Sequence, residues 1–210
     1  MKRINFLITA LLLNFTATGL MMAADVSSGP LVWCGLDYSK VKMIGTTDFR
    51  QPDQIFPRML AEWNALFMKE MLPQLEKMTR DVNTDLEAVQ ALNEKASPKQ
   101  VEMKDGSKSE MVDASDFTAA DIEKQVASYK LSKTSGLGLV FIVDRLVKAQ
   151  ETGCTYVVFF DVSSRKVLLS ERACEKAGGI GFRNYWFRPI KTVVDSKKLA
   201  KMYKTVQGTK

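Results

Sequence analysis

The stretch CTYVVFFDV, residues 154–162, decides how the second half of this chain folds. It is apolar almost throughout and rich in β-branched and aromatic residues, which favour strands. A strand with apolar side chains on both faces is typical of the middle of a sheet that is covered on both sides. The sequence therefore predicts a central strand at this point.

Two further strand-like runs flank it, LGLVFIVDRLVKA at 137–149 and KVLLSERAC at 166–174. The turn-like segments QETG and SSR join the three runs, and this order predicts an antiparallel meander. The hairpin formed by the last two runs places Cys154 opposite Cys174 at its open end. A disulfide between them is one interpretation, and two separate thiols are the other. The chain has three cysteines, so at least one stays outside any disulfide within the chain.

The first half of the chain predicts helices that need a sheet to pack on. LVWCGLDYSKVKMIG, residues 31–45, is strand-like, and a long helix follows it until Pro73 ends or kinks that helix. The apolar residues that mark its buried face at helical spacing are Phe56, Leu60, Trp63, Phe67 and Met71. Pro52 suits the first helical position.

Shorter elements follow. A short strand is expected within 81–86 and a helix after it, then a surface loop or exposed hairpin over 97–116. Thr118 and Asp121 form a capping-box-like start for another helix. We therefore predict one α+β domain over residues 25–210, with a mixed or mostly antiparallel sheet, a C-terminal β-meander and helices packed against the sheet.

The first 24 residues have the layout of a signal peptide. Lys2 and Arg3 precede an apolar stretch, and Ala23 and Ala24 supply small residues for cleavage after either of them. A membrane anchor is the alternative, but the stretch is broken by Asn and Thr and is shorter than the roughly 20 apolar residues of a span. Cys34 lies too far downstream for a lipid anchor. We predict a periplasmic or secreted protein with no membrane span after cleavage.

The residue inventory excludes several chemistries. The chain has no histidine, which removes Ser–His–Asp and Cys–His nucleophiles and histidine-ligated metals. No CxxC pair is present, and we expect no cofactor and no metal. The net charge of +6 comes from scattered lysines, and the lysine-rich segment 195–210 is interpreted as a solvated tail or helix face, not as a nucleic-acid site. This inventory favours a non-enzymatic protein and leaves a carboxylate-dependent enzyme as an alternative.

The segment KAGGIGFRNYW, residues 176–186, allows two interpretations. A cradle for an anion or a partner would use Gly178, Gly179, Gly181, Arg183 and Asn184, but G-G-x-G matches neither the dinucleotide nor the P-loop pattern. A structural corner would use the glycines to reverse the chain with positive φ angles. Phe182, Tyr185 and Trp186 would then hold a following helix against the sheet, with Pro189 close to the start of that helix. The corner is the favoured interpretation.

Asp161 is expected to accept a hydrogen bond in the hairpin turn. A pair with Asp144 or Glu171 for acid–base catalysis is the alternative, as is an ion pair with Arg165 or Lys166.

Residues 156–186, with FFD and KVL in the hairpin and GGIGFRNYW after it, resemble a family of exported bacterial proteins that has no established activity. The segments DYSKVKMIG and TSGLGLVFIV are compatible with the same family. The resemblance implies a secreted, single-domain protein. We expect a non-enzymatic domain that contacts other proteins of the cell envelope. A small-ligand or anion-binding protein is the alternative, and a carboxylate-dependent enzyme is a remote third.

Overall fold

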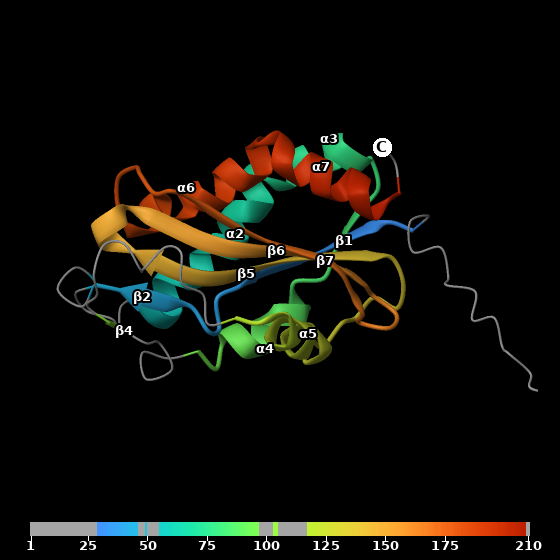
Figure 1. Cartoon of the computed structure of the whole chain (residues 1–210), viewed down its shortest axis with the longest axis horizontal. Helices are drawn as coiled ribbons and strands as arrows, with labels where there is room; N and C mark the ends of the chain where they lie inside the picture. Colours follow the sequence, from blue (N-terminus) through green and yellow to red (C-terminus); the bar gives the residue numbers. More distant parts are fainter. Residues whose placement is uncertain (1–28, 46–48, 50–54, 97–102, 105–116, 209–210) are drawn as a thin grey trace, which may run out of the picture.

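A seven-stranded mixed sheet with helices on both faces forms the centre of the protein (Figure 1). The computed structural model describes residues 29–45, 49, 55–96, 103–104 and 117–208. The prediction of an α+β fold is confirmed. The expected signal peptide, the expected helix start at Pro52 and most of the expected loop at 97–116 lie outside the described residues. No helix within the described ranges is long and apolar enough to cross a membrane.

The C-terminal half of the sheet is the predicted antiparallel meander. It consists of β5 (Leu137–Val147), β6 (Thr152–Asp161) and β7 (Val167–Lys176). The middle strand β6 is buried on both faces, and Phe159 and Phe160 are both fully buried. This burial explains the near-continuous apolar sequence of β6, since one face packs against each helical layer.

The N-terminal half of the sheet is parallel. Strands β1 (Leu31–Asp37) and β2 (Lys42–Ile44) lie end to end along one edge of β5 and run parallel to it. The short strands β3 (Val82–Thr84) and β4 (Met103–Lys104) add to β1 and β2, also in parallel. The strand-like run at 31–45 is therefore two strands, separated by a turn at 38–41.

Two asparagine side chains stabilise the irregular end of β1. The pairing with β5 shifts register between Trp33 and Gly35, and Gly35 has φ +101°. Asn64 accepts a hydrogen bond from Leu36 N at 2.7 Å and donates one to Leu36 O at 3.2 Å. Asn93 donates to the same oxygen at 2.8 Å from the opposite layer. The backbone groups released by the bulge therefore stay satisfied inside the protein.

Helices cover the sheet in two layers (Figure 1). One face carries α2 (Leu60–Glu70), α3 (Leu72–Thr79), α6 (Phe182–Asp195) and α7 (Lys197–Val206). The other carries α4 (Glu87–Asn93) and α5 (Ala119–Ala127).

The predicted helix signals are confirmed in α3 and α5. Pro73 lies in the first turn of α3, so the chain is interrupted at Met71. Thr118 and Asp121 form a complete capping box at the start of α5. The apolar stripe of the long helix is split, since a π-helix at Ile55–Met59 precedes α2.

Pro189 is not near the start of its helix as the sequence suggested, but inside α6. A proline there leaves the carbonyl four residues earlier without its helical donor and needs space for its ring. Gly178 N donates to that carbonyl, Tyr185 O, at 3.0 Å. Gly153 makes room for the ring, since a Cβ at 153 would lie 2.9 Å from Pro189 Cγ. Contacts from two other segments therefore make an interior proline possible.

A buried polar network joins the end of β1 to α5. The Asp37 carboxylate, which is 1% exposed, accepts hydrogen bonds from Tyr129 OH at 2.8 Å and Gln125 Nε2 at 2.7 Å. Its other oxygen accepts from Ser39 N at 3.0 Å and Ser39 Oγ at 2.6 Å. Four neutral donors therefore hold one buried carboxylate, and they position α5 against the sheet.

We expect the protein to lose stability at alkaline pH. Burial, then the nearby Asp37 charge, raises the pKa of Tyr38 to about 12 and that of Tyr129 well above its usual range. Unfolded tyrosines lose their proton near pH 10. The contribution of these two tyrosines to the free energy of unfolding is therefore fully present below about pH 10 and falls as the pH rises above it. Each tyrosine lowers the free energy of unfolding by at most about 1.4 kcal/mol for each pH unit. Urea unfolding between pH 8 and 12 measures this slope, and Tyr129→Phe is expected to make it shallower. A stability independent of pH across this range would contradict the prediction.

Candidate functional site

The glycine segment connects β7 to α6 and presents an exposed apolar side chain. Gly179 has φ +118° and Gly181 φ +77°, which agrees with the predicted chain reversal. Ile180 lies between them and its side chain is 91% exposed. Leu168, on β7, is the other large apolar residue that stays exposed among the described residues, at 39%. Sequence reasoning did not single out Ile180, because exposure depends on how the loop is oriented.

Gly178 has a different role from the other two glycines. Its φ is not positive, so chain reversal does not require a glycine there. Instead its N–H completes the hydrogen bonding of α6, and its missing Cβ makes room for Arg188. A Cβ at 178 would lie 3.0 Å from Arg188 Nη1 and 3.3 Å from Arg188 Cδ.

Arg183 and Asn184 belong to the corner itself. Arg183 Nη1 forms an ion pair with Glu62 of α2 at 3.0 Å, and its Nε donates to Asn184 Oδ1 at 3.2 Å. The indole N–H of Trp63 donates to Arg183 O at 3.2 Å. These contacts fasten the first turn of α6 to α2 and match the structural interpretation of both residues.

The three aromatic residues of the segment also anchor it. Trp186 is buried and stacks on Phe49 with ring centroids 5.5 Å apart, and Phe182 meets the same ring edge-on at 6.4 Å. Tyr185 OH donates to Glu151 at 3.0 Å and accepts from Lys148 Nζ at 3.1 Å. Contacts with α2, with the β5–β6 turn and with the aromatic core therefore hold the loop, and only its tip projects.

Two grooves flank the loop. The larger, about 570 Å³, lies between α2 and α6 and includes Gly178, Arg188 and Lys191 in its lining. The smaller, about 370 Å³, is lined by Arg58, Ile180 and the first residues of α6. Arg183 and Asn184 line both grooves. Four of the five residues proposed from the sequence, Gly178, Gly181, Arg183 and Asn184, therefore line these grooves together with Ile180, Arg58 and Arg188, while Gly179 lines neither.

The start of α6 is open to a negatively charged group. Gly181 supplies no side-chain cap and the first turn contains no acidic residue. The N-terminus of a helix carries a partial positive charge, and backbone N–H groups there favour anions. No ion pair is present for Arg58 or Arg188 among the described residues. The surface around Ile180 is therefore apolar at its tip and carries Arg58 and Arg188 at its sides, and the larger groove also contains the carboxylates of Glu70 and Asp195.

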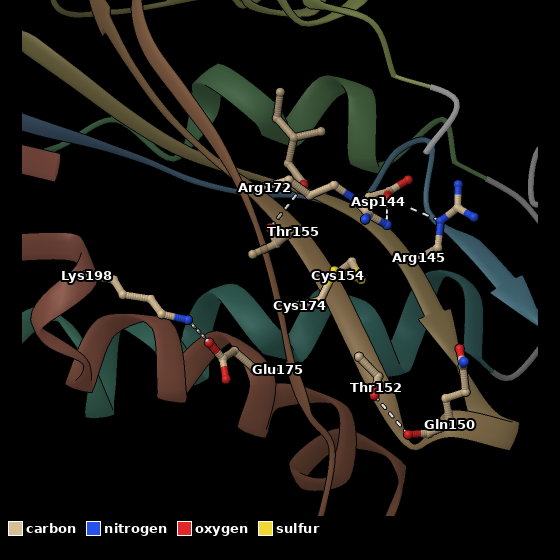
Figure 2. The surroundings of a disulfide bond; sticks show 11 residues. Asp144, Arg145, Gln150, Thr152, Cys154, Thr155, Arg172, Cys174, Glu175 and Lys198 are labelled. Carbon is tan, nitrogen blue, oxygen red and sulfur yellow. Dashed lines mark hydrogen bonds and ion pairs between the residues drawn. A yellow bond between two sulfur atoms is a disulfide. The ribbon is translucent and has the colours of Figure 1, made fainter. Parts of the chain in front are cut away.

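Cys154 and Cys174 form a disulfide between β6 and β7 (Figure 2). The two residues are direct partners in the register of the hairpin. Cys34 is the remaining cysteine and is buried. Burial strongly raises the pKa of the Cys34 thiol, so Cys34 is not a reactive thiolate.

Asp144 lies near the disulfide in an ion cluster (Figure 2). It is the extra residue at a bulge of β5, and one of its oxygens meets Arg172 Nη2 at 2.8 Å and Arg145 Nε at 3.2 Å. Burial, then the charge of Arg145, lowers the pKa of Lys42 close by. The negative charge of Asp144 therefore balances the positive charges of Arg145 and Arg172 within the sheet.

Asp161 and Asp144 lie too far apart to act as a carboxylate pair. Asp161 pairs with Leu137 at one end of β5, whereas Asp144 lies beyond Val143, which places them roughly 20 Å apart at about 3.3 Å per residue. Asp161 instead accepts hydrogen bonds from Ser163 Oγ at 2.5 Å and Ser164 N at 2.6 Å, as expected for the turn. Burial opposes its ionisation, but these hydrogen bonds outweigh it and lower the pKa of Asp161.

Glu171 pairs with Val157 on β6 and is exposed, so the other partner considered for Asp161 is also far from it. Within the described ranges, no group of three or more histidine, cysteine or carboxylate side chains is placed to hold one metal ion. The sequence matches no protein-family model and no curated protein sequence.

Proposed function

We propose that this chain is an exported bacterial envelope protein that acts by binding another protein through the surface around Ile180. The observation that carries the proposal is the exposure of Ile180 on a loop held at both ends. An apolar side chain on a fixed loop binds with little loss of conformational entropy, and such anchors contribute most of the affinity of an interface. The disulfide is compatible with an oxidising compartment outside the cytoplasm.

Replacing Ile180 with aspartate is expected to weaken the complex with the partner at least tenfold without unfolding the protein. The side chain is almost fully exposed in the free protein, so its loss costs little stability but removes the anchor of the interface. The complex is measured by size-exclusion chromatography of envelope extracts from the producing bacterium, followed with an antibody. Ala120→Asp is the matched control, because Ala120 is exposed in the first turn of α5, on the opposite face of the sheet, where an acidic residue is favourable.

The same preparation tests export. Osmotic shock is expected to release a mature protein that begins at Ala24 or Asp25, as read by mass spectrometry. A full-length protein in the cytoplasm, or a complex that Ile180→Asp leaves intact, would contradict the proposal.

A small anion is the second candidate ligand of this surface. The open positive end of α6 beside Arg183 favours it. A rise in the melting temperature with phosphate or nucleotides, absent in Arg183→Ala, would favour this function over protein binding.

A further inference from the structure

The groove between α2 and α6 is an open trough beside the Ile180 loop. Leu66 of α2 is half-buried and provides apolar surface in it, and the buried ring of Phe187 lies beneath. Asn184, Arg188 and Lys191 come from successive turns of one side of α6. The volume, about 570 Å³, is within the range of ligand sites, roughly 300–1,000 Å³. Small-molecule sites enclose most of the ligand surface, so an open trough fits an extended segment of a larger molecule better.

Among the described residues, Arg188 is the cation of this groove that has no carboxylate partner. Lys191 forms an ion pair with Glu70 at 3.4 Å, and Arg183 forms one with Glu62 at 3.0 Å. Both pairs connect α6 to α2. Arg188 is exposed, and no ion pair is present for it among the described residues. Its guanidinium therefore keeps its hydrogen-bonding capacity for a ligand.

The Arg188 side chain packs beside the loop backbone at Gly178. The Arg188 side chain lies so close to the loop that a Cβ at 178 would come within 3.0 Å of Nη1. The loop backbone and α6 therefore confine the side chain on two sides. A side chain restricted on these sides loses less conformational entropy when it binds an anion.

Building on the proposed function, we propose that this groove receives an acidic segment of the partner protein, with a carboxylate of that segment bound by Arg188. Arginine binds carboxylates through two parallel hydrogen bonds. Leu66 offers a contact for an apolar side chain next to the carboxylate. A flat lipid surface would leave the groove unfilled, which favours a protein segment over a membrane.

The test uses a fluorescently labelled peptide of alternating glutamate and leucine residues, and its binding to the purified protein is followed by anisotropy. We expect Arg188→Gln to weaken binding at least tenfold, which is the effect of losing one charge-assisted hydrogen-bonded contact. Lys201→Gln, which removes an exposed cation on α7, is the matched control and should change binding less than twofold. A peptide in which lysine replaces every glutamate should not bind.

Gly178→Ala provides a second variant, because it keeps the charge of Arg188 but displaces the guanidinium. We expect it to weaken binding several-fold, and circular dichroism shows whether the fold is kept. Equal binding by native protein and Arg188→Gln, or no binding to the native protein, overturns the inference. So does binding to phosphatidylglycerol vesicles with the same dependence on Arg188.

These outcomes are separate from those of the proposed function. If Ile180→Asp breaks the envelope complex while Arg188→Gln binds the acidic peptide normally, the groove assignment fails and the proposed function stands. If Ile180→Asp leaves the complex intact, the proposed function fails whatever the peptide does.

Discussion

Replacing Asp37 with alanine is expected to lower the free energy of unfolding by about 3–5 kcal/mol. The change removes the acceptor of four hydrogen bonds and leaves buried donors of Gln125, Tyr129 and Ser39 without it. Each buried donor left unsatisfied costs about 1–3 kcal/mol. The desolvation cost of the carboxylate is avoided at the same time and offsets part of this loss. Since domains are stable by only about 5–15 kcal/mol, the variant should be close to unfolding.

Urea unfolding measures the effect, and two further variants control it. Asp37→Asn keeps one acceptor oxygen and the shape of the side chain, so it should lose about half as much. Tyr129→Phe removes one donor, so Asp37→Ala should cost less in that background than in the native protein. A loss below about 1 kcal/mol for Asp37→Ala would show that α5 is held by its apolar contacts alone.

Replacing both Cys154 and Cys174 with serine is expected to lower stability by roughly 3 kcal/mol. The disulfide joins residues that are 20 positions apart, and in the chain-entropy model a loop of this length restricts the unfolded chain by about that amount. For a protein of this size the melting temperature should fall by roughly 6–12 °C, at about 2–4 °C per kcal/mol. Differential scanning calorimetry measures both values.

A reducing agent provides the control for this experiment. It should lower the melting temperature of the native protein by a similar amount and leave that of the double serine variant unchanged, because Cys34 remains a buried single thiol in both. A native protein that melts at the same temperature with and without reductant would contradict the prediction. Protein made without its first 24 residues in a reducing cytoplasm should resemble the reduced form.

The meander and the ends of several helices were predictable from sequence because their signals are local. The apolar run of β6, the turn residues beside it and the Thr118–Asp121 capping box act over a few residues each. The register of one hairpin also brings Cys154 opposite Cys174. Neighbouring residues decide these features, so the pattern of residue types along the chain is enough to find them.

The parallel half of the sheet was not predictable in the same way. Leu31 of β1 pairs with Leu137 of β5, more than a hundred positions later, and no local pattern specifies that pairing. The predicted position of Pro189 near the start of its helix was wrong for a related reason. A proline ends most helices, but here Gly178 supplies the missing donor and Gly153 supplies the space.

The sequence by itself determined the fold class, the antiparallel meander and the position of the glycine loop, four of whose five proposed residues line the surface beside Ile180. Only the tertiary structure decided what that surface presents. It exposes Ile180, pairs Arg183 with Glu62 and leaves Arg188 beside Gly178 for a ligand. Local structure follows from backbone preferences and periodicity, which neighbouring residues carry. Exposure and charge pairing depend on which distant segments pack together, and only the folded chain brings those segments into contact.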